Sequence, residues 1–160
     1  MFKKVFILVL VLLNIGCDQI SKNIVRKTVE YQEHISLISD NFILTKVENK
    51  GAMMGLGSDL SPTLKMVLLQ GLPIVVLLIL LFRILQKPKM DSALVFAFAC
   101  VIGGGIGNLI DRIAHGQVTD FFHIDLGFVR TGIFNMADVS VTMGVLLILI
   151  LSLSNRKFEM

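Results

Sequence analysis

The chain has 160 residues, of which 54% are hydrophobic, and its net charge is +3. This length suits about one domain, and so high an apolar fraction excludes an ordinary soluble globular protein. The basic residues are scattered at the ends of long apolar runs, where they mark the polar sides of a membrane. A nucleic-acid-binding protein is therefore excluded as well.

Four apolar runs predict four transmembrane helices, at about residues 5–25, 64–85, 92–110 and 134–153. Each run is close to the ~20 residues that an α-helix needs to cross ~30 Å of hydrocarbon. We therefore expect a single membrane domain over residues 1–160, an all-α integral membrane protein with four transmembrane helices.

An even number of spans places both termini on one side of the membrane, and the charges indicate which side. The terminal side carries two acidic residues, Asp91 and Glu159, and seven basic ones: Lys3, Lys4, Arg83, Lys87, Lys89, Arg156 and Lys157. The opposite side carries eight basic and ten acidic residues. The positive-inside rule then places both termini in the cytoplasm, with the loops of about 26–63 and 111–133 outside.

The N-terminus permits another interpretation, a lipoprotein signal peptide that would end at Cys17. Lys3 and Lys4 precede an apolar run that closes with the letters NIGC. However, the polar residues after Cys17 continue at helical spacing, because Asp18 and Lys22 are four residues apart and can pair on one helix face. This spacing favours a membrane helix that continues past Cys17.

A β-rich insert is predicted at about residues 29–60. Two runs typical of strands, 34–38 and 42–48, are separated by the turn residues 39–41. We expect a small extracytoplasmic sheet on the membrane surface, which would form a cradle over the outer ends of the helices.

Two features inside the predicted spans concern helix shape and packing. Pro73 is expected to kink the second helix and to free the carbonyl of Leu69. The third helix contains a run of four glycines, which predicts either close helix packing or a groove open to a substrate backbone or a lipid chain. These glycines are Gly103, Gly104, Gly105 and Gly107.

Polar side chains from four separate segments are expected at the outer ends of the helices. Each has an ordinary explanation taken alone, such as Asp138 complementing a helix dipole or Arg112 reaching lipid headgroups. Their convergence at one depth favours a functional site. The set comprises Asp18, Lys22, Asn108, Asp111, Arg112, Asp120, Asn135 and Asp138.

Two carboxylates in a poorly solvated site cannot easily both ionise, so the pair holds one shared proton, as in aspartic proteases. One carboxylate then takes a proton from water and the other protonates the scissile group. A Ser21–Lys22 dyad is disfavoured because adjacent residues face different sides of a helix. The three histidines lack the spacing of metal ligands, so we expect no metal.

Five ordered blocks of the sequence resemble lipoprotein signal peptidase, the bacterial type II signal peptidase. They are DQISK at 18–22, NKGAMMG at 49–55, GGGIGNLIDR at 103–112, GQVTDF at 116–121 and FNMAD at 134–138. The resemblance covers nearly all of the chain. It implies a membrane aspartic peptidase of the bacterial inner membrane, with four transmembrane helices and an extracytoplasmic β-rich cradle.

The same resemblance implies roles for individual residues. Asp120 and Asp138 would be the catalytic pair, and Asp18 and Lys22 a supporting pair. The residues that would bind substrate are Asn49, Gly104, Asn108, Arg112 and Asn135.

The resemblance also implies the reaction and the partners. The enzyme would remove the signal peptide of diacylglyceryl-modified prolipoproteins just before the lipidated cysteine, without a metal or cofactor. Membrane lipid and the antibiotic globomycin would be further partners, and we expect a monomer.

Two other classes of function remain open from the residues alone. Carboxylates inside a membrane protein serve proton or ion relays in transporters, although the inner halves of the four predicted spans contain no acidic residue. A non-enzymatic membrane assembly protein is the third possibility, in which the aspartates would matter only for folding.

Overall fold

The structure, a computed structural model, describes residues 2–39, 41–87 and 90–154. The elements in chain order are α1 (Phe2–Thr28), β1 (Ile35–Ile38), β2 (Phe42–Asn49), the 3-10 helix η1 (Met53–Gly55), α2 (Pro62–Lys65), the π-helical segment η2 (Met66–Gly71), α3 (Leu72–Gln86), α4 (Ser92–His115), β3 (Val118–Ile124) and α5 (Met136–Leu153).

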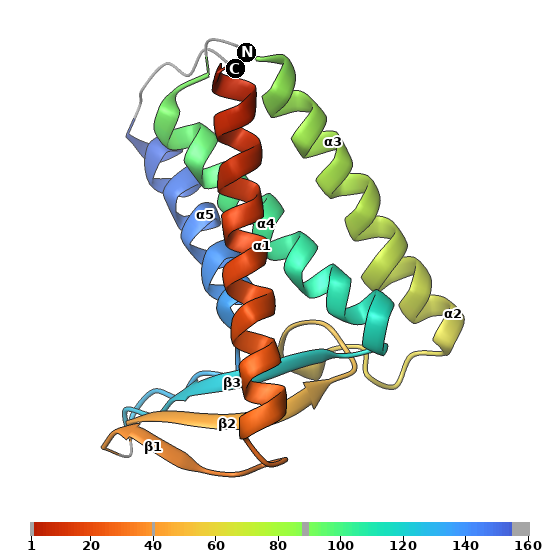
Figure 1. Ribbon diagram of the computed structural model, residues 1–160, viewed down its shortest axis with the longest axis vertical. Helices are drawn as coiled ribbons and strands as arrows, with labels where there is room; N and C mark the ends of the chain where they lie inside the picture. Colours follow the sequence, from red (N-terminus) through yellow and green to blue (C-terminus); the bar gives the residue numbers. More distant parts are fainter. Residues whose placement is uncertain (1, 40, 88–89, 155–160) are drawn as a thin grey trace.

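The four predicted transmembrane helices are confirmed. The helices long and apolar enough to cross a membrane are Lys3–Thr28, Pro62–Gln86, Ser92–His115 and Met136–Leu153. The start of α1 and the end of α5 lie at one end of the bundle, and the sheet lies at the other (Figure 1). The two outer loops therefore meet at one end, as the topology requires.

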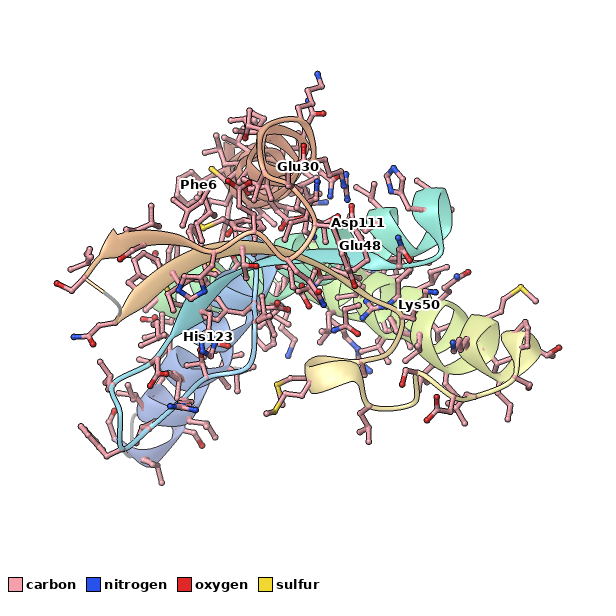
Figure 2. The ribbon with its side chains drawn as sticks, turned by 90° about the horizontal axis from the view of Figure 1, so that it is seen from below. Phe6, Glu30, Glu48, Lys50, Asp111 and His123 are labelled. Atoms are coloured by element: carbon pink, nitrogen blue, oxygen red, sulfur yellow. The ribbon has the colours of Figure 1, made fainter. Side chains whose placement is uncertain are left out.

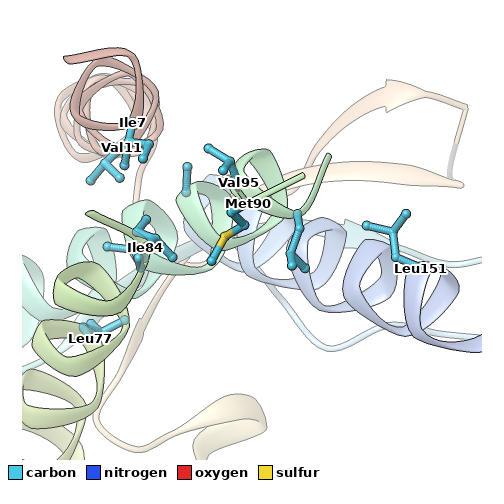
Figure 3. Packing of buried hydrophobic residues seen from close by; sticks show 10 residues of the cluster. Ile7, Val11, Leu77, Ile84, Met90, Val95 and Leu151 are labelled. Atoms are coloured by element: carbon cyan, nitrogen blue, oxygen red, sulfur yellow. The ribbon is translucent and has the colours of Figure 1, made fainter. Parts of the chain in front are cut away.

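Helix α4 occupies the centre of the bundle and contacts α1, α3 and α5. It is the most buried of the four spans. Buried apolar side chains pack around it, and Ile7 and Val11 of α1, Leu77 and Ile84 of α3 and Val95 of α4 belong to one cluster (Figure 3). Hydrophobic side chains that face outward from the bundle are exposed, as expected for a surface in contact with lipid.

The glycines of α4 allow its neighbours to approach closely. A Cβ at Gly103 would lie 2.5 Å from the Asn14 side chain of α1, and one at Gly104 would lie 2.4 Å from the Ala137 carbonyl oxygen of α5. A Cβ at Gly105 would meet Leu77 of α3 at 2.8 Å. Successive glycines thus face different helices, so the close-packing interpretation holds and the groove interpretation is wrong for Gly104, which is buried against α5.

The second span contains an irregular segment before Pro73, whereas the kink and the free Leu69 carbonyl stay predictions. The π-helical segment η2 (Met66–Gly71) ends two residues before Pro73, in the same membrane span. Proline has no N–H to donate, and a π-helical segment changes the local hydrogen-bond pattern of an α-helix. The helix therefore continues past Pro73 with an altered turn instead of ending there.

The sheet is antiparallel with the order β1-β2-β3. Strands β1 and β2 confirm the two predicted runs, although Asp40 of the predicted turn lies outside the described residues. Strand β3 was not predicted, because its segment was expected to be loop. It pairs with β2 across a bulge between Leu44 and Val47, next to the pairing of Val47 with Asp120.

Helix α4 ends later than the predicted residue 110, at His115. Gly116 follows it with φ of 71°, a left-handed conformation in which its N–H donates to the Arg112 carbonyl. Asp111 and Arg112 therefore lie within the last turns of the helix, with side-chain directions that the helix fixes.

The orientation of the bundle in the membrane gives a testable prediction. Lys89, Arg156, Lys157 and Glu159, which contribute to the charge difference, lie outside the described residues. We expect reporter fusions after Lys87 and after Met160 to read as cytoplasmic, and fusions at Ser58 and Gly127 to read as extracytoplasmic. A cytoplasmic signal at Gly127 would contradict the proposed orientation.

Candidate active site

The sheet end of the bundle brings together side chains from β2, α4, β3 and α5. Asp120 lies on β3 and is only 4% exposed. Its Oδ2 accepts a hydrogen bond from Asn49 Nδ2 at 3.0 Å, and its Oδ1 accepts one from Asn135 Nδ2 at 2.6 Å. Strand β3 thus delivers a buried carboxylate held by two amides.

The environment of Asp120 changes its acidity. Burial raises the pKa of its carboxyl to about 6, because desolvation disfavours the charged form. The hydrogen bonds from Asn49 and Asn135 lower this pKa, and the negative charge of Asp138 raises it. The carboxyl therefore titrates close to neutral pH, in the range useful for acid–base chemistry.

Asp138 is fixed at the start of α5 by a capping box. Its Oδ2 accepts from the Asn135 backbone N–H at 3.1 Å, and its own N–H donates to Asn135 Oδ1 at 3.0 Å. Its Oδ1 accepts from Asn108 Nδ2 at 2.8 Å. The helix N-terminus also favours a negative charge at this position. Asn135 and Asp138 are thus joined by two hydrogen bonds, each from a backbone N–H to a side-chain oxygen.

The two aspartates are joined through two amide side chains. Asn135 Nδ2 donates to Asp120 Oδ1 and also to Asn108 Oδ1 at 3.1 Å. Asn108 in turn donates to Asp138. These four residues come from three segments expected at one depth, and in the structure they form one hydrogen-bonded group.

A buried cluster of charges lies beside this group, between α1 and α4. Lys22 Nζ contacts Asp18 Oδ2 at 2.8 Å and Asp111 Oδ2 at 3.2 Å, and all three side chains are fully buried. Arg26 Nη2 contacts Asp111 Oδ2 at 2.8 Å. The predicted Asp18–Lys22 pair is confirmed. Asp111 was expected among the site residues, but it belongs to this cluster instead. It lies near Glu48 (Figure 2), and Thr119 contacts both residues.

The charge cluster is connected to the candidate active site at two points. Lys22 Nζ donates to Asn108 Oδ1 at 2.9 Å. Asp18 Oδ1 accepts from the Ala137 backbone N–H in the first turn of α5 at 2.9 Å. Because Asn108 turns its oxygen toward Lys22, its NH₂ group faces Asp138. The supporting role expected for Asp18 and Lys22 is consistent with these contacts.

Arg112 does not pair with either aspartate. Among the residues that the structure describes, no carboxylate lies within 4.0 Å of its guanidinium. Its Nη2 donates to the Gly51 carbonyl at 3.0 Å. Arg112 therefore holds the loop after β2 against α4, and it interacts with Asp138 and Asp120 through charge, without a direct ion pair.

Asn49 fastens the same loop to Asp120. Its Nδ2 donates to Asp120 and to the Ala52 carbonyl at 3.0 Å, and its Oδ1 accepts from the Gly51 N–H at 2.9 Å. Gly51 has no space for a side chain, since a Cβ there would lie 2.6 Å from the Gly55 backbone. Asn49 was expected to contact substrate, and in the structure it contacts the aspartate.

Sequence reasoning missed Arg26 and Thr119. Arg26 Nε donates to Thr119 Oγ1 at 2.8 Å, and the Thr119 N–H donates to Asp111 at 3.2 Å. Arg26 lies four residues after Lys22, and therefore on the same helix face as Asp18 and Lys22. That spacing was a signal that the sequence offered.

The chain is similar in sequence to known proteins. The model of the family described as signal peptidase (SPase) II matches residues 10–154. The chain is 35% identical over 157 residues to a lipoprotein signal peptidase of Streptococcus pneumoniae, covering 98% of this chain and 97% of that protein. It is 35% identical over 141 residues to one of Chlorobium phaeobacteroides, covering 83% and 81%.

Solved structures agree with the sequence comparisons. A bacterial membrane enzyme determined by the in meso method at 2.3 Å resolution matches with a TM-score of 0.82 and 27% sequence identity. The match covers 97% of this chain and 94% of that one. The family match spans most of the chain, including the small sheet and the five ordered sequence blocks, and the chain therefore belongs to the signal peptidase II family of membrane proteases.

Proposed function

We propose that the chain is an aspartic endopeptidase that removes the signal peptide from diacylglyceryl-modified prolipoproteins. It cleaves just before the lipidated cysteine, with Asp120 and Asp138 activating water. The observation that carries the proposal is the joining of these two carboxylates through Asn108 and Asn135 at the sheet end of the bundle. The names of the relatives support the substrate class.

In this proposal the two carboxylates have different roles, Asp138 as the general base and Asp120 as the general acid. Asp138 accepts one hydrogen bond from the Asn135 backbone N–H and one from the Asn108 side-chain amide, and it lies at the start of α5, which favours a carboxylate. In the proposed reaction Asp138 takes a proton from water as the water oxygen attacks the scissile carbonyl carbon. Asp120, whose pKa is about 6, gives its proton to the carbonyl oxygen. As the C–N bond breaks, Asp138 protonates the leaving amine and Asp120 recovers a proton from the diol.

The substrate meets this site at the membrane surface. A precursor held by its lipid and by its own apolar helix presents the scissile bond near the outer interface, where the sheet lies. Met53 and Met54 of η1 are 82% and 77% exposed. Methionine is flexible and adapts to irregular apolar partners, so these side chains suit signal peptides of varied sequence.

The lipid dependence of cleavage tests the proposed substrate. We expect purified protein in detergent to cleave a diacylglyceryl-modified precursor and to leave the unmodified precursor intact, as measured by gel shift and by mass spectrometry of the new N-terminus. Globomycin should block the reaction, and a monomer should suffice for it. Equal cleavage of both precursors would contradict the proposed specificity.

Asn49→Ala should impair this reaction by altering Asp120. The variant loses the hydrogen bond to the Asp120 anion that forms when Asp120 gives its proton to the carbonyl oxygen. A hydrogen bond to a charged group contributes about 1.5–3 kcal/mol, so kcat/KM should fall about 10- to 100-fold. Because that bond lowers the pKa of Asp120, its removal should raise the pKa seen in the pH profile. The matched control is Asn41→Ala in the exposed turn before β2, which should behave as wild type. An unchanged pH profile in Asn49→Ala would contradict this role.

A further inference from the structure

The end of the bundle opposite the sheet contains a basic cavity between α1 and α3. It has a volume of about 480 Å³, and its lining includes Lys3 and Lys4 from α1 and Lys87 after α3. Its floor is apolar, with Ile7 and Ile84 both almost completely buried (Figure 3). Three cations around an apolar floor favour a ligand that is both anionic and amphipathic.

Two of the three lysines around this cavity are not neutralised by a carboxylate of the described residues. Neither Lys4 nor Lys87 has an acidic partner within 4.0 Å in the part of the chain that the structure describes. Asp91 is the described acidic residue at this end, and its carboxylate is engaged by the N–H groups of Ala93 and Leu94 at the start of α4. Lys3 Nζ donates to the Met90 carbonyl at 2.6 Å, which holds one wall of the cavity in place.

An apolar hollow of about 460 Å³ adjoins the basic cavity on α3. It is lined by Leu78, Ile79, Leu81, Phe82 and Leu85, and Leu85 also lines the basic cavity. Leu78, Phe82 and Leu85 share one helix face because they are spaced by four and three residues. The hollow therefore runs along α3, from the basic cavity toward the middle of the membrane.

We propose that this combined site binds a phospholipid with an anionic headgroup. The phosphate lies among Lys3, Lys4 and Lys87, and one acyl chain lies along the α3 face from Leu85 to Leu78. Lysine is a compact cation that binds phosphate as a point charge, and basic pockets between transmembrane helices bind anionic headgroups. The site lies at the opposite end of the bundle from Asp120, so it is independent of the proposed proteolysis (Figure 1).

Lipid titration of the purified protein in a neutral detergent tests the proposal. We expect phosphatidylglycerol to raise the melting temperature and to remain bound in native mass spectrometry, whereas phosphatidylcholine of equal chain length should do neither. Lys4→Gln with Lys87→Gln should weaken phosphatidylglycerol binding about 30-fold. The matched control is Lys27→Gln with Lys65→Gln, which removes two lysines from the other ends of the same two spans and should bind as wild type.

Three results would overturn the proposal. They are equal binding of the two lipids, undiminished phosphatidylglycerol binding by the double variant, and full stabilisation by glycerol 1-phosphate, which has the headgroup phosphate without acyl chains. If the double variant does not fold, Lys87→Gln alone decides, with an expected loss of about 5-fold.

Discussion

Asp120→Asn and Asp138→Asn should each lower kcat for the lipidated precursor by about 10³-fold or more. Asparagine keeps the size of the side chain but cannot exchange a proton, so the transfer between water, carboxyl and scissile group is lost. The matched control is Asp125→Asn, which alters a carboxylate just after β3 that pairs with Arg130 outside the site. That variant should keep wild-type kcat. Substantial cleavage by either folded site variant would contradict the proposed dyad, and proton flux through vesicles that depends on Asp138 would favour a relay.

The stability of wild type and the stability of Asp120→Asn should depend differently on pH. The pKa of Asp120 is about 6 in the folded state against 3.8 for an ordinary aspartate. The folded state therefore binds more protons between these values, so wild-type stability falls as pH rises from about 4 to 6, and the loss persists above 6. Asp120→Asn removes this loss, on the order of 3 kcal/mol. The melting temperature of Asp120→Asn minus that of wild type should therefore be larger at pH 7.5 than at pH 4.

Lys22→Met should destabilise the protein by about 3–5 kcal/mol. The substitution removes the cation that Asp18 and Asp111 share. Asp111 keeps its contact with Arg26, but the fully buried Asp18 is left without a cation, and an uncompensated buried charge is costly. The measurement is the free energy of unfolding in detergent. Lys27→Met, an exposed lysine five residues along α1, should change it by less than about 0.5 kcal/mol.

A second substitution separates charge from packing at Lys22. Asp18→Asn in the Lys22→Met background neutralises the carboxylate that Lys22→Met leaves without a cation, so it should restore part of the stability. A loss in Lys22→Met no larger than that in Lys27→Met would show that the cluster contributes little. A loss that Asp18→Asn makes worse would show that the cost arises from packing.

The four spans and the first two strands could be predicted from sequence because their signals are local. Long apolar runs predict the spans, and two β-rich runs around a turn predict β1 and β2. Strand β3 gives no such signal, because Val118, Thr119, Asp120 and Phe121 are all buried and polar and apolar residues do not alternate on its two faces. Its place depends on pairing with β2, which is distant in sequence.

The candidate site was predictable as a set of residues but not as a set of contacts. Helical spacing alone predicted the Asp18–Lys22 pair. The contact of Arg112 with Gly51 depends on the path of the loop after β2, and the amide links of Asn108 and Asn135 depend on how α4 and α5 pack. Such side-chain hydrogen bonds join elements distant in sequence, so no local pattern encodes them.

The capping box of α5 has a consequence for when proteolytic activity first appears during synthesis. Asn135 and Asp138 start the last described helix and also complete the site, while Asp120 and Asn108 precede them in the chain. A nascent chain that has emerged only as far as β3 carries one carboxylate of the pair and lacks the other. Since chains emerge from the N-terminus, the proposed pair of aspartates is complete only when α5 packs against α4, and we expect a chain that ends before α5 to be inactive.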